Sequence, residues 1–328
     1  MRAWRRADGE HGERARARGR LRGRGFPCRG RPAQGVPLSQ PEPRADRPAW
    51  LRARYRQTPE LDGLLALVRD ERLNTVCRSA ACPNIGECWS RGTATFMIGG
   101  NRCTRACGFC DVATGRPDAL DADEPDRVAK AVARLGLRFA VVTSVARDDL
   151  DDGGASHFAR TIEAIRARAP SCRIEVLIPD LKGSIEALGV VLAASPDVLN
   201  HNLETVERLQ HSVRKAGRYD RSLALLANAA RLRTDIPTKT GLMLGLGERE
   251  AEIRQALVDI RAQGCRLLTI GQYLAPSAEH LPVARWVTPD EFDAWAREAR
   301  GLGFAEVFSG PLVRSSYRAE QLAAAALG

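Results

Sequence analysis

Three closely spaced cysteines have the pattern of an iron–sulfur ligand set. Cys103, Cys107 and Cys110 form a C-x3-C-x2-C array. Thiolates this close together can bind three irons of a cubane cluster and leave the fourth iron without a protein ligand. Structural zinc is the alternative, but it requires four ligands, commonly in paired C-x2-C knuckles, and no histidine lies nearby in the sequence. The array therefore predicts a reactive cluster with one open iron.

A second group of cysteines precedes the first. Cys77, Cys82 and Cys88 form a C-x4-C-x5-C array around the loop-forming residues 83–86. These three also need a fourth ligand from elsewhere, so their spacing alone fits either a cluster or zinc with a distant ligand. No signal-peptide core is visible, so this density of cysteines favours metal or cluster ligation over disulfides. The isolated Cys172 and Cys265 lie in or beside apolar segments and are expected to be buried thiols.

The elements that position these cysteines alternate between strands and helices. Apolar, β-rich segments predict six strands, at 94–98, 139–145, 174–178, 198–203, 238–244 and 267–273. Helical periodicity between them predicts helices at 127–135, 157–167, 184–194, 221–233 (capped by Asp220) and 249–263. Thr288 and Glu291 form a capping box that opens a last helix, with Pro289 at its first position. Each crossover is long enough for a parallel pair, which predicts a parallel α/β architecture.

Polar and glycine-rich segments follow the second, fourth, fifth and sixth predicted strands. In parallel α/β folds the ligand lies at the carboxyl ends of the strands. Taken singly, such residues are usually turn and helix-cap residues. Four segments in succession at the same edge favour a ligand site, and the candidates within them are Thr143, Ser144, Asn202, Glu204, Gly241, Gly245 and Gln272.

Charge and hydropathy exclude two classes of partner. The 328 residues carry a net charge of +10, but residues 1–48 alone contain 13 Arg against five acidic residues. The remaining chain, with 37 basic and 35 acidic residues, has no nucleic-acid footprint. No apolar run approaches the roughly 18 residues needed to cross a bilayer, so no membrane association is expected. Residues 1–48 are expected to be a disordered basic tail, and the protein bacterial and cytoplasmic; an organelle matrix is the alternative if the tail is a transit peptide.

Several motifs together resemble one enzyme family. The array ending in Phe109-Cys110 is similar to the signature of radical S-adenosylmethionine enzymes. The residues around Cys82 and Cys88 (CPNIGECW), the motif NHNLET at 200–205 and RSSY at 314–317 resemble lipoyl synthases, over roughly residues 47–321. This resemblance implies a partial (β/α)6 TIM-type barrel with N-terminal and C-terminal extensions that cover its open face. The implied domains are the tail (1–48), an N-terminal extension (49–93), the barrel (94–309) and a C-terminal segment (310–328).

The resemblance also implies a reaction and its residues. Two sulfur atoms would be inserted at C6 and C8 of an octanoyl chain on a carrier-protein lysine. The cofactors would be S-adenosylmethionine and two [4Fe–4S] clusters, one of them a sacrificial auxiliary cluster. Cys103, Cys107 and Cys110 would bind the radical-generating cluster. The strand-end candidates would bind S-adenosylmethionine, and the auxiliary cluster would be held by Cys77, Cys82, Cys88 and Ser316, with Arg314 beside it.

The implied partners are octanoylated carrier domains, namely the glycine cleavage H protein or the E2 subunits of 2-oxoacid dehydrogenases. An electron donor such as ferredoxin or flavodoxin and an iron–sulfur carrier for cluster repair complete the set. Ala146 and Arg318 depart from the family pattern, which usually shows Asp and His there. Two alternatives stay open: another sulfur-inserting radical enzyme related to biotin synthase, and an electron-transfer or zinc-stabilised interaction protein.

Overall fold

Seven parallel strands form one open sheet and follow one another in the order of the chain. The computed structural model describes residues 47–51, 69–76 and 84–327. Neighbouring strands are all parallel, and β1 and β7 are the two edges of the sheet, which confirms the predicted partial α/β barrel. The strands are β1 (Thr93–Ile98), β2 (Phe139–Ser144), β3 (Arg173–Leu177), β4 (Val198–Asn200), β5 (Thr238–Leu244), β6 (Leu267–Gln272) and β7 (Glu306–Gly310).

Two strands differ from the sequence-based expectation by more than one residue at an end. The sheet contains β7, which the sequence did not reveal, because Val307 is the only fully buried residue of this short edge strand. β4 ends at Asn200 and not at 203. The chain turns there, since Glu204 adopts a left-handed backbone conformation with φ of +70°. The turn directs the residues after β4 toward the carboxyl end of the sheet.

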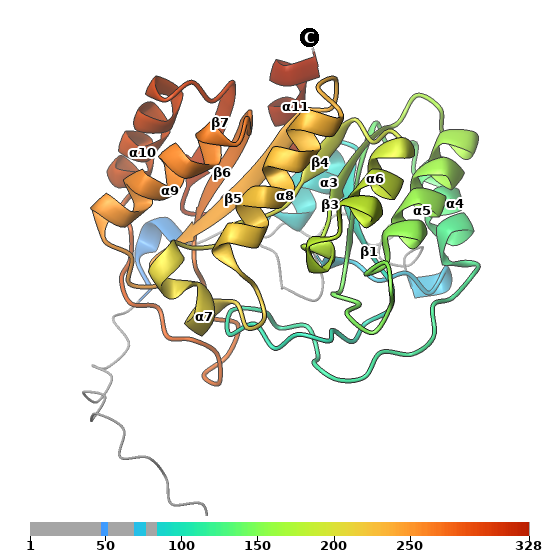
Figure 1. The fold of residues 1–328 in the computed structure, drawn as a ribbon, viewed down its shortest axis with the longest axis horizontal. Helices are drawn as coiled ribbons and strands as arrows, with labels where there is room; N and C mark the ends of the chain where they lie inside the picture. Colours follow the sequence, from blue (N-terminus) through green and yellow to red (C-terminus); the bar gives the residue numbers. More distant parts are fainter. Residues whose placement is uncertain (1–46, 52–68, 77–83, 328) are drawn as a thin grey trace, which may run out of the picture. The chain divides into compact units, whose positions relative to one another are not determined.

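The helices α4, α5, α6, α8, α9 and α10 cover the outer face of the sheet (Figure 1). The capping box that opens α10 is present, with the Thr288 hydroxyl accepting from the Glu291 N–H. The start of α8 was predicted wrongly: it begins at Tyr219, so Asp220 lies in its first turn and pairs with Arg218. The described helices are α3 (Ile85–Ser90), α4 (Glu124–Arg134), α5 (Ala155–Arg168), α6 (Ile185–Ala193), α7 (Gln210–Val213), α8 (Tyr219–Leu232), α9 (Glu250–Ala262), α10 (Pro289–Gly301) and α11 (Ala319–Leu327), with 3-10 turns η1 (Ala49–Leu51), η2 (Leu181–Gly183) and η3 (Glu207–Leu209).

The inner face of the barrel is closed at one end by the last helix. Phe139, Val198 and Leu267, at the amino ends of their strands, form a buried cluster with Ala319 and Leu322 of α11. In Figure 1 α11 lies at the end of the sheet opposite α7 and the long loops. Burial of this apolar surface fixes α11 at the amino end, so the carboxyl ends of the strands remain available to a ligand.

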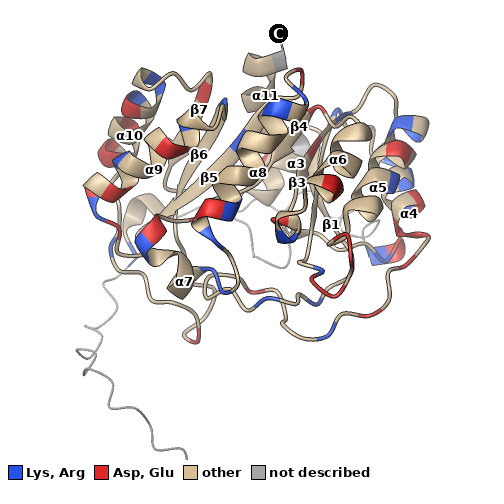
Figure 2. Cartoon of the chain, in the orientation of Figure 1, with Lys and Arg blue, Asp and Glu red and all other residues tan. Residues whose placement is uncertain are grey.

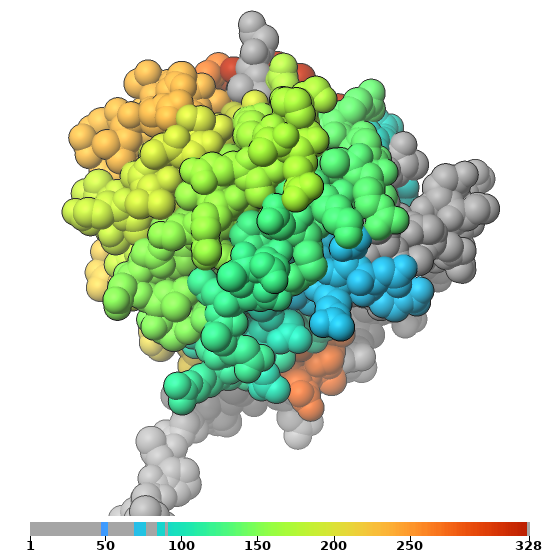
Figure 3. All heavy atoms as spheres, turned by 90° about the vertical axis from the view of Figure 1, so that its right-hand side faces the viewer, coloured from blue at the N-terminus to red at the C-terminus, as the bar shows by residue number. Residues whose placement is uncertain are grey.

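One described segment before the sheet packs on α4. Glu71 accepts from Lys130 and Arg134 of α4, and the segment 69–76 lies against this part of the molecule in Figure 3. Acidic and basic residues alternate along the solvent face of the helices (Figure 2), as on an ordinary hydrated surface. Within the described ranges no helix is long and apolar enough to cross a membrane.

Candidate functional site

The three cysteines of the first array lie in one loop between β1 and α4, at the carboxyl end of the sheet. Cys103, Cys107 and Cys110 are each partly buried. Burial, and then the nearby Cys110 sulfur, raise the pKa of the Cys107 thiol to about 12. Buried thiols held this close together are poor acids until they bind cations, as the ligands of a metal centre do.

The loop presents backbone donors to one of these sulfurs. The N–H groups of Arg105 and Ala146 point at Cys103 Sγ, at 3.4 and 3.3 Å. Such donors stabilise a ligating thiolate. Ala146 makes this contact, and accepts from Thr104 N–H, through its backbone alone. The substitution of the usual Asp therefore leaves both contacts in place.

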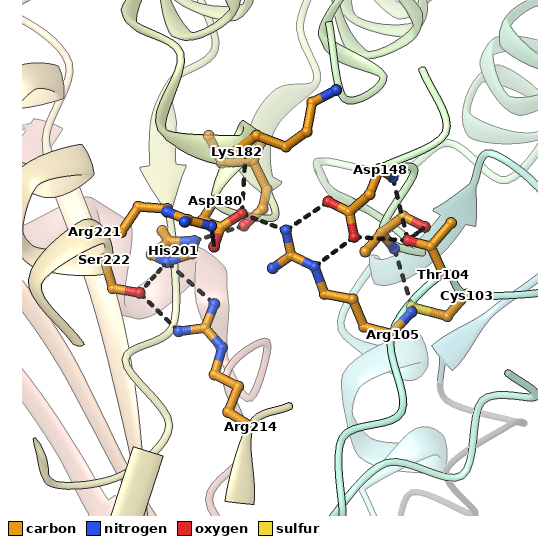
Figure 4. A network of polar contacts seen from close by, with 12 residues as sticks. Cys103, Thr104, Arg105, Asp148, Asp180, Lys182, His201, Arg214, Arg221 and Ser222 are labelled. Carbon is orange, nitrogen blue, oxygen red and sulfur yellow. Dashed lines mark hydrogen bonds and ion pairs between the residues drawn. The ribbon is translucent and has the colours of Figure 1, made fainter. Parts of the chain in front are cut away.

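Arg105 ties the cysteine loop to two other strand ends (Figure 4). Its guanidinium forms a bidentate pair with Asp148, with N–O distances of 2.8 and 2.7 Å. The same group reaches Asp180 after β3 at 2.6 Å. Burial alone would raise the pKa of Asp180, but the hydrogen bond and charge of Arg105 outweigh it and lower this pKa to about 2.

A second buried cation lies beside the first. Arg214 donates to Ser222 Oγ at 2.7 Å, and its guanidinium lies 3.3 Å from His201 Nε2. His201 Nδ1 lies 2.9 Å from the Ile178 carbonyl, which can only accept, so Nδ1 carries the proton and Nε2 is an acceptor. Burial, and then the charge of Arg214, lower the pKa of His201 to about 3. The imidazole is therefore neutral, and Arg214 keeps its charge available to the site.

The residues that follow β4 lie at the carboxyl end of the sheet, as the cysteine loop does. Glu204 holds its left-handed conformation through backbone hydrogen bonds to Gly241 and Met243 of β5. Burial raises the pKa of Glu204, while the charge of Arg214 and a hydrogen bond from the Asn202 side chain lower it. The negative charge of Glu204 in turn raises the pKa of Cys107. Strained backbone of this kind is typical of functional sites.

The glycine-rich end of β5 leaves room for these side chains. A Cβ on Gly241 would lie 2.8 Å from Thr269 Oγ1 and 2.9 Å from Asn202 Oδ1, closer than real side chains approach. Gly245 begins the following loop and donates its N–H to Glu248. Gln272, at the end of β6, is buried, and its amide bonds backbone groups at Leu244, Tyr273, Arg285 and Val287. Gln272 thus holds the loops that follow β5 and β6 in place beside the site.

The end of β2 contributes two hydroxyl groups. Thr143 donates to the Leu177 carbonyl of β3 at 2.9 Å. Ser144 Oγ is buried and has no hydrogen-bond partner within the described part of the chain. A buried hydroxyl without a partner is uncommon in a folded protein and is suited to a ligand that supplies one.

The C-terminal segment brings the second candidate site together. Asn84 Nδ2 donates to the Leu312 carbonyl at 2.6 Å. The Arg318 guanidinium and the Tyr317 hydroxyl both bind Glu87, on the helix α3 that also carries the buried Cys88. Ser316 and Arg314 therefore lie in a segment that is anchored at α3, through Leu312 before them and through Tyr317 and Arg318 after them. Cys77 and Cys82 lie outside the described residues.

Comparison with known proteins identifies the chain's family. Residues 97–260 match the model of the radical SAM superfamily. The chain is 55% identical to the lipoyl synthase of Nitrosococcus oceani, over 86% of this chain and 87% of that protein. It is also 55% identical to the lipoyl synthase of Thermus thermophilus, with 88% and 90% of the two chains covered. The chain belongs to the lipoyl synthase family. The structure of HydG, a maturase of the [FeFe]-hydrogenase, has the same fold, with a TM-score of 0.54, 14% identity and coverage of 82% of this chain and 67% of that one.

Lipoyl synthases use S-adenosylmethionine and two [4Fe–4S] clusters, and the described residues fit these cofactors. Within the described ranges, no three His, Cys, Asp or Glu side chains converge on a single metal ion. A cubane cluster needs no such convergence, since each thiolate binds its own iron. The partly buried thiols, the donors to Cys103 and the buried charges of Arg214 and Glu204 make a polar cradle for a cluster and a zwitterionic ligand. Sequence reasoning missed Arg105, Asp148, Asp180 and Arg214, because only spatial proximity connects them.

Proposed function

We propose that this chain inserts two sulfur atoms, at C6 and C8, into an octanoyl group bound to a carrier-protein lysine. The observation that supports this best is the seat of the Ser316 segment against the helix of Cys88, beside a barrel whose loop holds the other three cysteines. A sulfur-inserting enzyme of this family needs both centres next to one barrel. An alkyl C–H has no useful acidity, so side-chain bases cannot activate it, and the cofactors supply the radical and the sulfur.

The proposed roles at the first centre follow from charge. Cys103, Cys107 and Cys110 would bind the cluster, and the loop contacts of Arg105 would keep them in place. Arg214 is a buried cation suited to the carboxylate of a methionine group. Glu204 offers an acceptor to an ammonium or to ribose hydroxyls. Thr143, Ser144 and Asn202 would complete the contacts, with Gly241 and Gly245 giving space and Gln272 supporting the loops.

The residues proposed for the second centre come from two distant parts of the sequence. Cys77, Cys82 and Cys88 would bind the auxiliary cluster, with Ser316 as its fourth ligand and Arg314 nearby. The Ser315 hydroxyl is engaged with Asn200 and Asn202, whereas Ser316 makes no hydrogen bond to another described residue. This difference supports Ser316 as the ligand. An alkoxide binds iron less well than a thiolate, which suits a cluster that gives up its sulfur.

The substrate class indicates which kinds of partner to propose. The substrate is a protein-bound octanoyl group, and we propose the glycine cleavage H protein or a 2-oxoacid dehydrogenase E2 domain as its carrier. Ferredoxin or flavodoxin would supply electrons, and an iron–sulfur carrier would restore the consumed cluster. We propose the bacterial cytoplasm as the compartment.

The mass of the acyl group tests the proposal. Anaerobically reconstituted protein is incubated with an octanoyl-lysyl carrier peptide, S-adenosylmethionine and a strong reductant. The expected product has gained two sulfur atoms. An unchanged peptide with continued formation of 5′-deoxyadenosine would show that the radical chemistry is right and the substrate wrong.

A further inference from the structure

A buried ion pair joins two strands of the sheet. Lys239 Nζ of β5 lies 2.8 and 2.9 Å from the two carboxylate oxygens of Glu175 on β3. Both side chains have no solvent exposure. A buried ion pair is by itself poor support for stability, because the cost of desolvation is close to the Coulomb gain. The ion pair matters for the site because it orients the polar side chains next to it.

The ion pair sets the direction of a chain of hydrogen bonds. A carboxylate only accepts, so the Asn200 amide turns its Nδ2 toward Glu175, at 2.7 Å. The same Nδ2 lies 2.9 Å from Ser315 Oγ, so Ser315 accepts its second hydrogen. The Ser315 hydroxyl is then free to donate in one direction only, to Asn202 Oδ1 at 2.9 Å.

The chain of hydrogen bonds ends at the first centre. Asn202 accepts from Ser315 through its oxygen, so its amide nitrogen is left to donate to a group at this strand end, where Glu204 follows two residues later. Gly241 leaves the space that Asn202 Oδ1 occupies. A continuous polar path therefore runs from Ser315 to Asn202, at the strand end that also carries Glu204.

The other end of the path is the segment that carries Ser316. Here the backbone approaches β6 so closely that a Cβ on Gly271 would lie 2.1 Å from the Val313 carbonyl oxygen. Ser316 follows Ser315 by one peptide bond, and Tyr317 binds Glu87 beside Cys88. The position of residues 312–318 is thus set by their contacts with β6 of the barrel and with α3.

We propose that Ser315 is a positioning residue that couples ligand binding at Asn202 and Glu204 to the seat of the Ser316 segment. This inference rests on the proposed function for the identity of the two centres. A ligand that contacts Glu204 and Asn202 strengthens the orientation of Asn202 and, through Ser315, orders the segment. Such coupling is reciprocal, so loss of the Ser315 hydroxyl weakens the ligand by the factor by which the ligand had ordered the segment.

Amide hydrogen exchange tests the coupling without sulfur transfer. Cluster-loaded protein is compared with and without saturating S-adenosylmethionine, with no octanoyl substrate. In the wild type the ligand is expected to slow exchange in residues 312–318 by about fivefold or more. In Ser315→Ala this slowing falls below about twofold, and the apparent affinity for S-adenosylmethionine falls about fivefold. Ser315→Thr keeps the hydroxyl and restores both effects.

Ser309→Ala is the matched control. Ser309 is a partly buried serine of the same C-terminal region, but its hydroxyl donates to the Phe292 carbonyl outside the path. This variant is expected to behave as the wild type. Equal slowing in Ser315→Ala and the wild type, or no slowing in the wild type, would overturn the inference. If Ser315→Ala does not fold, Ser315→Gly, which also lacks the hydroxyl, takes its place with the same expectation. If the octanoyl-lysyl peptide gains no sulfur but S-adenosylmethionine still slows exchange in residues 312–318, the proposed function is rejected and the coupling stands.

Discussion

The Arg105 guanidinium and the Asp180 carboxylate lie 2.6 Å apart, inside the protein, and join the cysteine loop to the end of β3. Arg105 is one residue from Thr104 and two from both Cys103 and Cys107. Its bonds to Asp180 and to Asp148 therefore fix the backbone on which the cluster would be held. A loop that must present three sulfurs to one cluster gains its geometry from such outer contacts.

Arg105→Lys is expected to weaken both the fold and the cluster. Lysine keeps the charge but loses the fork that binds both carboxylates, so the free energy of unfolding should fall by about 2–3 kcal/mol. Loss of iron to a chelator should be about tenfold faster. Arg166→Lys is the control, since Arg166 of α5 pairs with Asp197 just before β4, outside the cysteine loop. Similar iron loss in the two variants would contradict a role for Arg105 at the cluster.

Substitutions in the two cysteine arrays should impair different steps of the reaction. Cys107→Ala is expected to abolish formation of 5′-deoxyadenosine, whereas Cys88→Ala retains it and loses sulfur insertion. Each variant should lose about half of the roughly eight irons of a two-cluster chain. Cys172→Ala, which changes a buried thiol distant from both arrays in the sequence, should keep all the iron. Loss of 5′-deoxyadenosine in a folded Cys88→Ala protein with its first cluster intact would contradict the assignment.

Ser316→Cys should keep the auxiliary cluster and impair its consumption. A thiolate binds iron more strongly than an alkoxide, so the iron content should be unchanged while sulfur insertion falls about tenfold. The measurement is sulfur inserted per 5′-deoxyadenosine formed. Ser309→Cys is the control and should retain the wild-type ratio. Wild-type turnover in Ser316→Cys would count against a serine ligand that matters for transfer.

Stability should fall in mild acid because of His201. Its pKa is about 3 in the folded protein, owing to burial and Arg214, against about 6.5 when unfolded. The unfolded chain therefore binds a proton first as the pH falls below 6.5, and stability is lost between these two values. From pH 7 to pH 5.5 His201 should account for a loss of about 1 kcal/mol. Urea unfolding of the wild type and His201→Gln checks this; an equal pH dependence in the two proteins would contradict it.

The sequence allowed the fold and the cysteine loop to be predicted because both depend on local patterns. Six strands and the capping box of Thr288 were readable from periodicity and spacing. β7 was missed because a short edge strand with one buried residue has no such pattern. The spacing of Cys103, Cys107 and Cys110 predicted their proximity, since they share one loop.

Contacts between distant residues could not be predicted in this way. Asp180 is 75 positions from Arg105, and Asn202 is 113 positions from Ser315. A chain with 50 basic and 40 acidic residues offers too many partners for any pair to be chosen from sequence. Only the convergence of strand ends in the barrel selects them. The roles of Cys77 and Cys82 stay predictions.

The source of the inserted sulfur is the most direct test of the two-centre mechanism. Both clusters are rebuilt with a heavy isotope of sulfur, free sulfide is removed, and a single turnover is run on an octanoyl-lysyl peptide. If the auxiliary cluster held by Ser316 and its cysteines is the donor, both inserted sulfurs will be heavy. Product that contains sulfur of natural mass would show that the sulfur comes from outside the protein and would contradict the assignment.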